Sequence, residues 1–336
     1  MAPRVLQGLY YKNEKMKIGI IVYEGCTASM VTGVLDILSL ANTQYKTKNG
    51  KALFELEIIS ETGKPVTSFS QLPIQAQRSI KTTHKYDLIY IPGFVGDVEN
   101  ILYKEKKIVT WLTSQYKKGS VLTAACNGNF LLAETGLLNG KNATTHWSLI
   151  DVFRSRYSKI TLEPEKIIVD SGDIISAAGV TAYFNLALFM VEKYSSKDLA
   201  IICAKVFLVD SGRKIQTPYQ MYQVSKKHGD NEILNVQNWL EKNYNEKITL
   251  SGMMNVCNLG KKTLIRRFKK VTGETPLIYL QKLRIENAKR ILESKSLSFN
   301  EITLEVGYND VSSFHKAFKS ETGLTPMEYR SKFSIV

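Results

Sequence analysis

The sequence has little of what marks membrane, secreted or metal-binding proteins. No apolar run reaches the roughly 18 residues that a membrane-spanning helix requires. The first 16 residues lack the apolar core of a signal peptide. The four cysteines lie far apart, and the chain has neither a Cys-x-x-Cys pair nor a Cys/His cluster. We therefore expect a cytoplasmic protein with free thiols, without a metal ion, a cofactor or a membrane partner.

Length and charge indicate two domains, one of them basic. The 336 residues suit two domains better than one, and the hydrophobic fraction of 44% is ample for two cores. The net charge is +14. Residues 226–336 hold 19 Lys or Arg and 12 Asp or Glu, so the last third is about twice as basic per residue as the rest. Such an excess favours a polyanionic partner, commonly nucleic acid.

The basic third contains an internal repeat. The stretch "FKKVTGETPLIY" (268–279) recurs as "FKSETGLTPMEY" (318–329), at an offset of 50 residues. Phe, Lys, Thr-Gly, Thr-Pro and Tyr keep the same register in both copies. This agreement indicates that one structural unit occurs twice.

Each copy of the repeat has the pattern of two short helices joined by a tight turn, which is a helix-turn-helix. Leu264 and Phe268 lie at i, i+4 and predict the buried side of the second helix in the first copy. Phe314 and Phe318 do the same in the second copy. The amphipathic stretch 276–294 between the copies predicts one continuous helix, a spacer that could set the two second helices about 34 Å apart, one DNA turn.

The predicted outward faces of the two second helices carry the candidate DNA-contacting residues. Lysine and arginine there can reach phosphates or guanine edges. The candidates are Lys261, Lys262, Ile265, Arg266 and Lys269 in the first copy, and Val311, Ser312, His315, Lys316 and Lys319 in the second. Asp310 is placed to cap the second of these helices. We expect the partner of this surface to be double-stranded promoter DNA.

The first two thirds alternate apolar strands with amphipathic helices. Strands are predicted at 16–23, 54–60, 86–93 and 120–126, with a strand pair within 166–179. Helices are predicted at 29–42, 98–118, 127–138, 180–195 and 196–210. This alternation predicts a three-layer, flavodoxin-like α/β domain with a mainly parallel sheet, followed by an all-α domain with two helix-turn-helix units. Ligands in such sheets collect at the carboxyl ends of the strands.

Cys126 lies at one of those strand ends, in "AACNGNFLLAETGLL" (124–138). Ala125 and Gly128 leave room for a cramped turn, as a nucleophile elbow requires. Three interpretations stay open for this cysteine: a small buried residue at a strand-to-helix junction, a thiol that senses or touches a ligand, or a hydrolytic nucleophile. Cys26, on the loop after the first strand, is expected to face the same space.

Residues 230–335 resemble the AraC/XylS-type DNA-binding domain, through "LIRRFKKVTGETPLIYLQKLRIENAKRIL" and "EVGYNDVSSFHKAFKSETGLTPMEYR". Residues 16–208 resemble the ThiJ/PfpI-like domains of the class I glutamine amidotransferase-like superfamily, through "YIPGF", "AACNGNFLLAETGLLNGKNATTHW" and "ISAAGVTAYFNLALFMVE". Residues 209–229 are expected to be the linker. The combination resembles the GlxA-type transcriptional regulators, which implies DNA contact through 260–270 and 310–320.

The same resemblance implies that the first domain senses a small-molecule effector and forms a homodimer. The expected pocket residues are Glu24, Cys26, Cys126, Asn127 and His146. PfpI-type proteases have histidine where this chain has Asn127, and relatives usually have aspartate where it has Asn185. These departures predict that Cys126 is a vestigial nucleophile and that the protein is no enzyme. The alternative is a cysteine-dependent amidase or hydratase-type enzyme that carries a DNA-binding domain.

Overall fold

The computed structural model describes residues 15–223 and 225–334, which form two compact units. The first unit ends at Gln216 and the second begins at Thr217. Residue 335, the last of the predicted DNA-binding domain, lies outside the described residues, as do most of the residues examined for a signal peptide. Within the part of the chain that is described, no helix is long and apolar enough to span a membrane.

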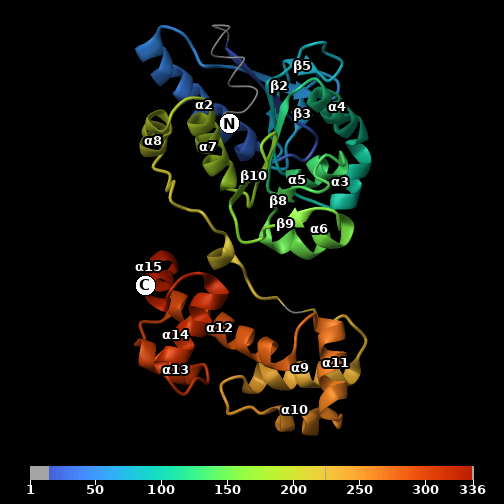
Figure 1. Ribbon diagram of the computed structural model, residues 1–336, viewed down its shortest axis with the longest axis vertical. Helices are drawn as coiled ribbons and strands as arrows, with labels where there is room; N and C mark the ends of the chain where they lie inside the picture. Colours follow the sequence, from blue (N-terminus) through green and yellow to red (C-terminus); the bar gives the residue numbers. More distant parts are fainter. Residues whose placement is uncertain (1–14, 224, 335–336) are drawn as a thin grey trace. The chain divides into compact units, whose positions relative to one another are not determined.

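A seven-stranded sheet forms the centre of the first unit (Figure 1). Its order is β10 (Ile168–Asp170), β11 (Ile174–Ala177), β7 (Val121–Ala125), β6 (Leu88–Ile91), β1 (Met16–Ile21), β2 (Phe54–Ser60) and β5 (Arg78–Ser79). All neighbours pair in parallel except β10 and β11. Strands β6, β7 and β11 are buried along their whole length, as strands covered on both faces must be.

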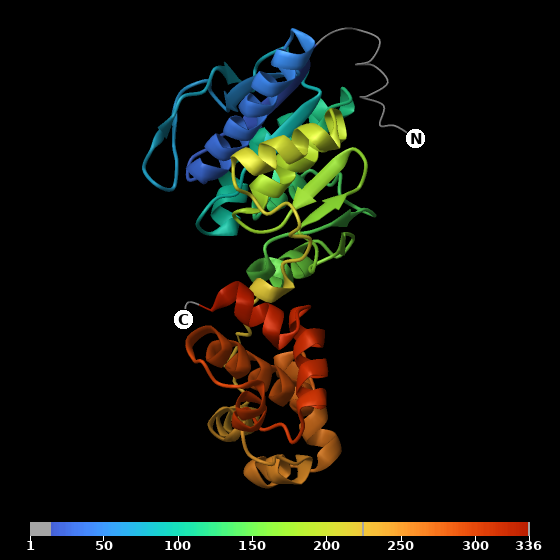
Figure 2. The same ribbon diagram turned by 90° about the vertical axis from the view of Figure 1, so that its left-hand side faces the viewer.

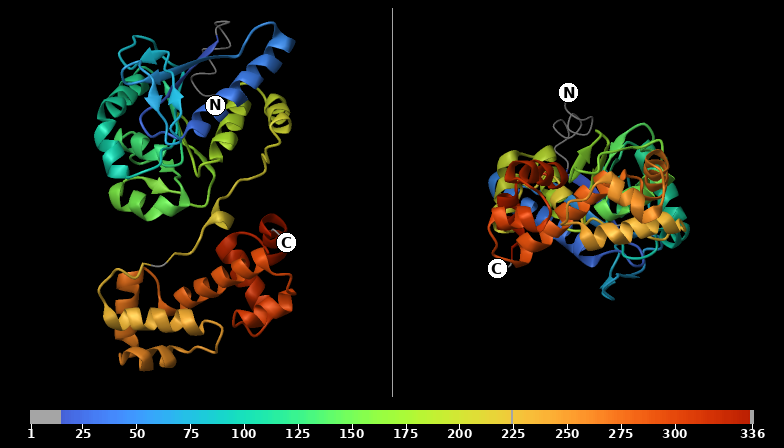
Figure 3. Two further views of the ribbon diagram at one scale, coloured as in Figure 1. Left: turned by 180° about the vertical axis from the view of Figure 1, so that it is seen from behind. Right: turned by 90° about the horizontal axis from the view of Figure 1, so that it is seen from below.

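Helices cover both faces of this sheet and produce the predicted three layers (Figures 1 and 3). On one side lie α2 (Ala28–Asn49), α7 (Ala182–Tyr194) and α8 (Lys197–Val206), which pack against one another, as Figure 2 shows face-on. On the other side lie α3 (Val98–Lys104), α4 (Lys106–Lys117) and α5 (Gly128–Glu134). The expected α/β fold with a mainly parallel sheet is therefore confirmed.

Short elements complete the first unit. They are the hairpin of β3 (Val66–Thr67) and β4 (Pro73–Ile74), the pair β8 (Asn142–Ala143) and β9 (Thr161–Leu162), the 3-10 helix η1 (Trp147–Leu149) and α6 (Ile150–Arg156). None of these was predicted from the sequence, because elements of two to seven residues carry too little periodicity.

Four predicted helices differ from the structure, two of them only in length. The helix expected at 29–42 runs on to Asn49, and the helix expected at 196–210 ends at Val206, two residues before Leu208 adopts a positive φ of 52°. The single helix expected at 98–118 is wrong: Glu105, with φ −93° and ψ 19°, separates α3 from α4 and turns its side chain inward. The helix expected at 127–138 ends at Glu134, because Gly136 adopts a positive φ of 72° that stops a right-handed helix.

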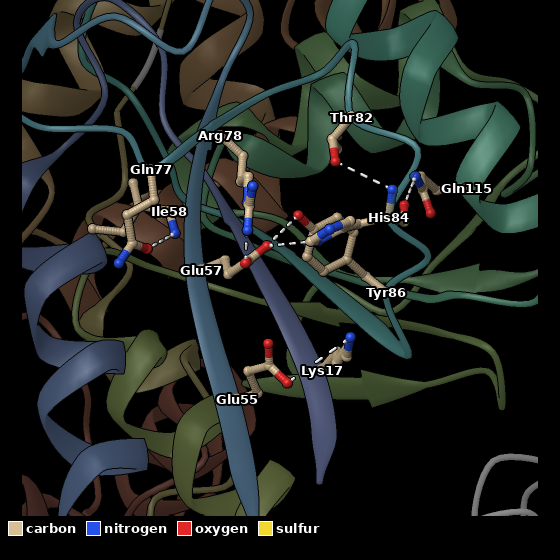
Figure 4. Close-up of polar contacts among 10 residues, drawn as sticks. All are labelled: Lys17, Glu55, Glu57, Ile58, Gln77, Arg78, Thr82, His84, Tyr86 and Gln115. Atoms are coloured by element: carbon tan, nitrogen blue, oxygen red, sulfur yellow. Dashed lines mark hydrogen bonds and ion pairs between the residues drawn. The ribbon is translucent and has the colours of Figure 1, made fainter. Parts of the chain in front are cut away.

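A polar cluster ties the edge strand β5 to the sheet (Figure 4). Glu57 of β2 accepts hydrogen bonds from the Tyr86 hydroxyl at 2.6 Å and from Arg78 Nε at 3.2 Å. His84 Nδ1 lies 3.5 Å from the same carboxylate. Burial raises the pKa of Glu57, but these hydrogen bonds lower it more, so the net pKa lies below the ordinary value. The cluster stabilises the sheet edge while Glu57 is ionised.

The second unit consists of two small helical cores that share one helix. The helices are α9 (Asn231–Asn243), α10 (Leu250–Cys257), α11 (Lys261–Thr272), α12 (Pro276–Ser294), α13 (Phe299–Glu305), α14 (Val311–Thr322) and α15 (Pro326–Phe333). The first half of α12 packs in one core with α9 to α11, and its second half packs in the other core with α13 to α15. As Figure 1 shows, α12 joins the two halves, so it is the continuous spacer predicted from the sequence.

The two halves repeat each other down to single hydrogen bonds. The Thr272 hydroxyl donates to the carbonyls of Phe268 and Glu274, and the Thr322 hydroxyl donates to those of Phe318 and Leu324. The helices α11 and α14 both end at a glycine with a positive φ, 82° and 76°. The 50-residue repeat is thus a structural duplication.

The segment predicted as a linker makes ordered contacts within each unit. Gln216 is buried and its amide donates to the carbonyls of Thr145 and Pro164, which holds it in the first unit. In the second unit, Lys289 of α12 donates to the carbonyl of Gln220 at 2.5 Å, and the Tyr222 amide donates to Glu286. Ordered structure therefore extends through most of residues 209–222.

Candidate functional site

The turn after β7 has the geometry of a nucleophile elbow. Cys126 adopts a φ of 58°, which costs a residue with a Cβ on the order of 1–3 kcal/mol. Two residues later, a Cβ at Gly128 would lie 2.4 Å from the carbonyl oxygen of Pro92, so only glycine fits there. The predicted cramped turn is therefore present.

Surrounding hydrogen bonds hold this strained turn in place. The Cys126 amide donates to the carbonyl of Ala177 at 2.8 Å. The Cys126 carbonyl accepts from Asn129 Nδ2 at 2.9 Å and from the Thr145 hydroxyl at 3.3 Å. Because Asn129 also donates to Ala177, one side chain joins the ends of β7 and β11. Asn129 was not singled out from the sequence, since nothing in its spacing shows this bridging role.

Asn127 acts as a clamp on the neighbouring loop. Its Oδ1 accepts from the Phe94 amide at 2.8 Å and its Nδ2 donates to the Phe94 carbonyl at 2.7 Å. The oxygen and the nitrogen of the Asn127 carboxamide are thus both hydrogen-bonded to the backbone of Phe94, and the side chain is buried. An amide held in this way neither takes up a proton nor orients a thiol.

The other predicted pocket residues converge on the same strand ends. Cys26 forms a β-bridge with Phe94, the residue that Asn127 clamps. Glu24 is exposed and its carboxylate accepts from the Thr67 amide at 3.0 Å. Four of the five predicted residues, Glu24, Cys26, Cys126 and Asn127, therefore lie in one loop cluster, and the Glu24 carboxylate holds the loop at Thr67 there.

His146 reaches this cluster through its neighbour Thr145, but its ring is engaged elsewhere. Its Nδ1 accepts from the Ser148 amide at 3.2 Å and lies 2.7 Å from the Ser148 hydroxyl. Burial lowers the pKa of His146. No hydrogen bond joins His146 to Cys126 within the described residues. The imidazole therefore caps η1 and is not positioned as a base for the thiol.

The electrostatic environment keeps the Cys126 thiol protonated. Its side chain is 6% exposed, and burial raises its pKa to about 11, with only the Asn127 amide opposing this shift. Burial likewise raises the pKa of Cys26 to about 11. An activated nucleophile needs a depressed pKa or an adjacent base. The described surroundings of Cys126 supply neither.

Two buried polar groups near the cysteines escaped the sequence analysis. The Tyr90 hydroxyl is fully buried, lies in the electrostatic neighbourhood of Cys126 and Cys26, and has no hydrogen-bond partner in the described part of the chain. Glu105 is 6% exposed, and burial, followed by the charges of Glu61 and Glu24, raises its pKa to about 7. In the sequence Glu105 stands in a run of lysines, a pattern typical of a solvated face.

The outer face of α11 is strongly basic. Leu264 and Phe268 are fully buried, as predicted, while Lys262, Arg266 and Lys269 are exposed along one side. The exposed cations of this helix form no ion pair among the described residues. They are Lys261, Lys262, Arg266, Lys269 and Lys270. Together with the partly exposed Ile265, four of them line a shallow hollow.

Arg267 lies on the same helix but serves a different purpose. Its guanidinium donates to Asp230 at 2.6 Å and 2.9 Å and to Glu232 at 2.7 Å. Asp230 is also the N-cap of α9. Arg267 therefore braces α11 against the start of α9.

The face of α14 repeats that of α11 with less charge. Ser312, Lys316 and Lys319 are exposed at the positions that correspond, 50 residues on, to Lys262, Arg266 and Lys269. The Asp310 side chain accepts from the Ser313 amide, which confirms the predicted N-cap.

The start and the middle of α14 are less exposed. Val311 is half-buried. His315 is also half-buried, packs edge-on against Phe299 and Phe314, and has a buried Nε2. His315 thus packs partly inward, unlike the exposed Ser312, Lys316 and Lys319.

Comparisons with known proteins agree with both units. The DJ-1/PfpI family model matches residues 16–193, and a helix-turn-helix domain model matches residues 253–332. The chain therefore belongs to the DJ-1/PfpI family and carries a helix-turn-helix domain. This combination is that of the GlxA-type transcriptional regulators.

Relatives of similar length are regulators, and a shorter one is an enzyme. The HTH-type transcriptional regulator CdhR of Pseudomonas aeruginosa is 25% identical over 83% of this chain and 82% of its own length. The HTH-type transcriptional regulator GbdR of the same species is 23% identical over 93% of this chain and 83% of its own length. The isonitrile hydratase of Pseudomonas putida is 25% identical over 55% of this chain and 75% of its own.

A solved structure has the same fold as the first unit. It is an AraC family transcriptional regulator from Pseudomonas putida, with a TM-score of 0.50 and 20% identity. The match covers 57% of this chain and 99% of the other.

Proposed function

We propose that this protein regulates transcription by binding promoter DNA through the outer faces of α11 and α14. The observation that carries the proposal is the duplicated register of exposed residues. Lys262, Arg266 and Lys269 recur as Ser312, Lys316 and Lys319 on helices of equal length. Helices in such pairs enter successive major grooves, where lysine and arginine contact phosphates and base edges. Because DNA is the partner, we place the protein in the cytoplasm.

Fluorescence anisotropy of the full chain with labelled promoter fragments tests this function. Each phosphate neutralised by a cation lowers log K by about 0.9 per tenfold rise in salt. Five cations lie in register, three on α11 and two on α14. They predict that log K plotted against log salt concentration has a slope of roughly −4 to −5. A flat salt dependence, or equal affinity for promoter and scrambled DNA, would refute the proposal.

Arg266 is the residue we expect to read a base. Arg266→Ala should weaken binding to the preferred site by about 1–3 kcal/mol and relax specificity at one position. Arg266→Lys keeps the charge but loses the bidentate geometry, so it should lose specificity yet keep the salt slope. Lys205→Ala removes a charge from the first unit and serves as the matched control, with unchanged affinity.

For the first unit, we propose a sensing and dimerising role without catalysis. The buried, protonated thiol of Cys126, the clamped amide of Asn127 and the engaged ring of His146 support it. The effector is expected to contact the strand ends around these residues. Thermal-shift screening of the full chain against metabolites, compared with Cys126→Trp, tests the site. Sedimentation velocity tests the homodimer.

The rival function is catalysis of the isonitrile hydratase type, favoured by the likeness to that enzyme over 55% of the chain. Turnover of isonitriles or small amides, lost in Cys126→Ala, would support the rival. We expect no turnover by either form.

A further inference from the structure

The two halves of the second unit contact each other directly, beside the helix that they share. Asn245 lies in the loop after α9, next to Tyr244, which packs on the core of α9 to α11. Gly307 lies in the turn between α13 and α14, next to Tyr308, which packs on the core of α13 to α15. A Cβ at Gly307 would lie only 2.8 Å from the Asn245 carbonyl oxygen, so glycine permits this close approach of two backbones.

Arg284 of α12 joins the two sides of this contact. Its Nε donates to the Tyr244 carbonyl at 2.8 Å, and a terminal nitrogen donates to the Glu246 carbonyl at 2.9 Å. Its guanidinium also lies over the Tyr308 ring, 5.5 Å from the ring centroid. One side chain therefore holds the first half by hydrogen bonds and the second half by a cation–π contact. We call Arg284, with residues 244–246 and 307–308, the α12 joint.

The surroundings of Arg284 favour a fixed geometry. The side chain is half-buried, and in the described part of the chain it forms no ion pair. A guanidinium is planar and donates in fixed directions, so two carbonyls and an aromatic ring restrict its orientation. On the far side, the Tyr308 ring packs against Phe314 of α14, with 5.6 Å between the ring centroids. The joint therefore reaches the helix that carries the second set of predicted DNA contacts.

The place of Arg284 on α12 is where the two cores meet. The preceding residue, Leu283, packs in the core of α9 to α11, and the following residue, Ile285, packs in the core of α13 to α15. Each half is thus attached to its own part of a single helix, and one helix by itself resists rotation of the two halves about its axis poorly. Contacts from Arg284 to both halves oppose that rotation.

We propose that Arg284 is a positioning residue, which sets the angle between α11 and α14 and thereby the separation of the two major-groove segments that the protein accepts. This inference rests on the proposed DNA-binding function, because the separation matters only if both helices contact one duplex. Each base pair adds about 3.4 Å and about 35° of rotation to a duplex. Helices held at a fixed angle accept one separation, whereas halves that rotate accept several.

Double electron–electron resonance of the full chain, spin-labelled at Lys270→Cys and Ser320→Cys, measures the joint without DNA. These two positions are exposed, lie in the last turns of α11 and α14, and correspond to each other across the 50-residue repeat. The four native cysteines are buried, and the labelled chain without the two substitutions gives the background. Arg284→Met keeps the stem and removes the donors, so it should broaden the distribution of distances between the labels.

Arg330 provides a matched control. Its guanidinium donates to the Leu297 carbonyl and lies 4.5 Å from the centroid of the Phe299 ring, so it makes the same kinds of contact within the second half alone. Arg330→Met should leave the distribution as narrow as that of the native chain. Arg284→Lys keeps the charge but not the planar fork, so it should broaden the distribution, and it serves where Arg284→Met does not fold. An unchanged distribution in the Arg284 variants, or equal broadening in Arg330→Met, overturns the inference.

Fluorescence anisotropy tests the consequence for DNA. The duplex is the promoter fragment that binds most tightly in the salt series, with one base pair inserted between the two grooves that footprinting shows to be protected. The insertion should weaken binding of the native chain and of Arg330→Met at least about tenfold, or about 1.4 kcal/mol, and binding of Arg284→Met less than about threefold. Equal losses in all three proteins overturn the role in spacing. If no promoter fragment is preferred, the proposed function fails and the role in spacing with it, whereas the label distances still decide whether Arg284 holds the two halves.

Discussion

The Cys126 thiol should react slowly with iodoacetamide at neutral pH. The thiolate is the reacting species. With a pKa of about 11, roughly 1 thiol in 10,000 is ionised at pH 7, against roughly 1 in 100 for a thiol at the ordinary value of 9. The structure therefore predicts a rate about 100-fold below that of a small thiol, before any further slowing because the side chain is only 6% exposed.

Peptide-resolved mass spectrometry of the folded chain measures this rate for each cysteine. The rate at Cys126 should rise about tenfold per pH unit between pH 7 and pH 9, without a plateau. Cys26, with a pKa also raised to about 11, provides an internal comparison from the same cluster. The Cys26→Ser and Cys126→Ser variants separate the two signals.

A plateau below pH 8, or a rate at Cys126 equal to that of free glutathione at pH 7, would refute the reasoning. Either result would mean that a base or a positive charge activates the thiol. The catalytic alternative would then regain its support, because an ionised thiolate at a strained elbow is what a nucleophile requires.

Three further predictions concern stability. Gly128→Ala should destabilise the first unit by about 3 kcal/mol or more, because the new Cβ would meet the Pro92 carbonyl at 2.4 Å. Gly252→Ala lies in a helix where the new Cβ would make only ordinary contacts, at 3.5 Å or more, so it should stabilise by up to about 1 kcal/mol, and equal effects of the two variants in urea unfolding would contradict this. Glu105 has a pKa of about 7 in the folded chain, above its unfolded value, so its protonated form favours folding. The free energy of unfolding should therefore fall as the pH rises from about 4.5 to 7. Glu105→Gln should stabilise the protein by up to about 3 kcal/mol at pH 8 and by little at pH 4.5. The hydrogen bonds from Arg267 lower the pKa of Asp230 in the folded chain. Their contribution to the free energy of unfolding is therefore present above about pH 4 and is lost as the pH falls through this lowered pKa. Arg267→Ala should abolish this acid-dependent loss of stability in the second unit. An unchanged acid unfolding transition would argue against a stabilising contact between Arg267 and Asp230.

Much of the fold could be predicted from the sequence because its signals are local. The duplicated Thr-Gly and Thr-Pro turns predicted the helix boundaries around α11 and α14, since each turn residue acts within its own few residues. The buried strands were predicted because parallel strands covered on both faces need continuous apolar runs, as in "VLTAA" of β7.

The candidate site was predicted less completely, because its chemistry depends on contacts far along the chain. The sequence suggested that Asn127 could not act as a base. Only the structure shows why it stands there: its partner, Phe94, is 33 residues away. Glu105 lies in a lysine-rich stretch, and nothing local shows that it turns inward.

By itself, the sequence determined the two-domain organisation, the duplicated helix-turn-helix and the strained turn at Cys126, since spacing, repetition and the size of single residues encode these features. Tertiary structure alone decided the protonation of the Cys126 thiol and the burial of the Glu105 carboxylate. Both depend on which distant groups exclude water from a given atom, and burial is a property of the packed chain.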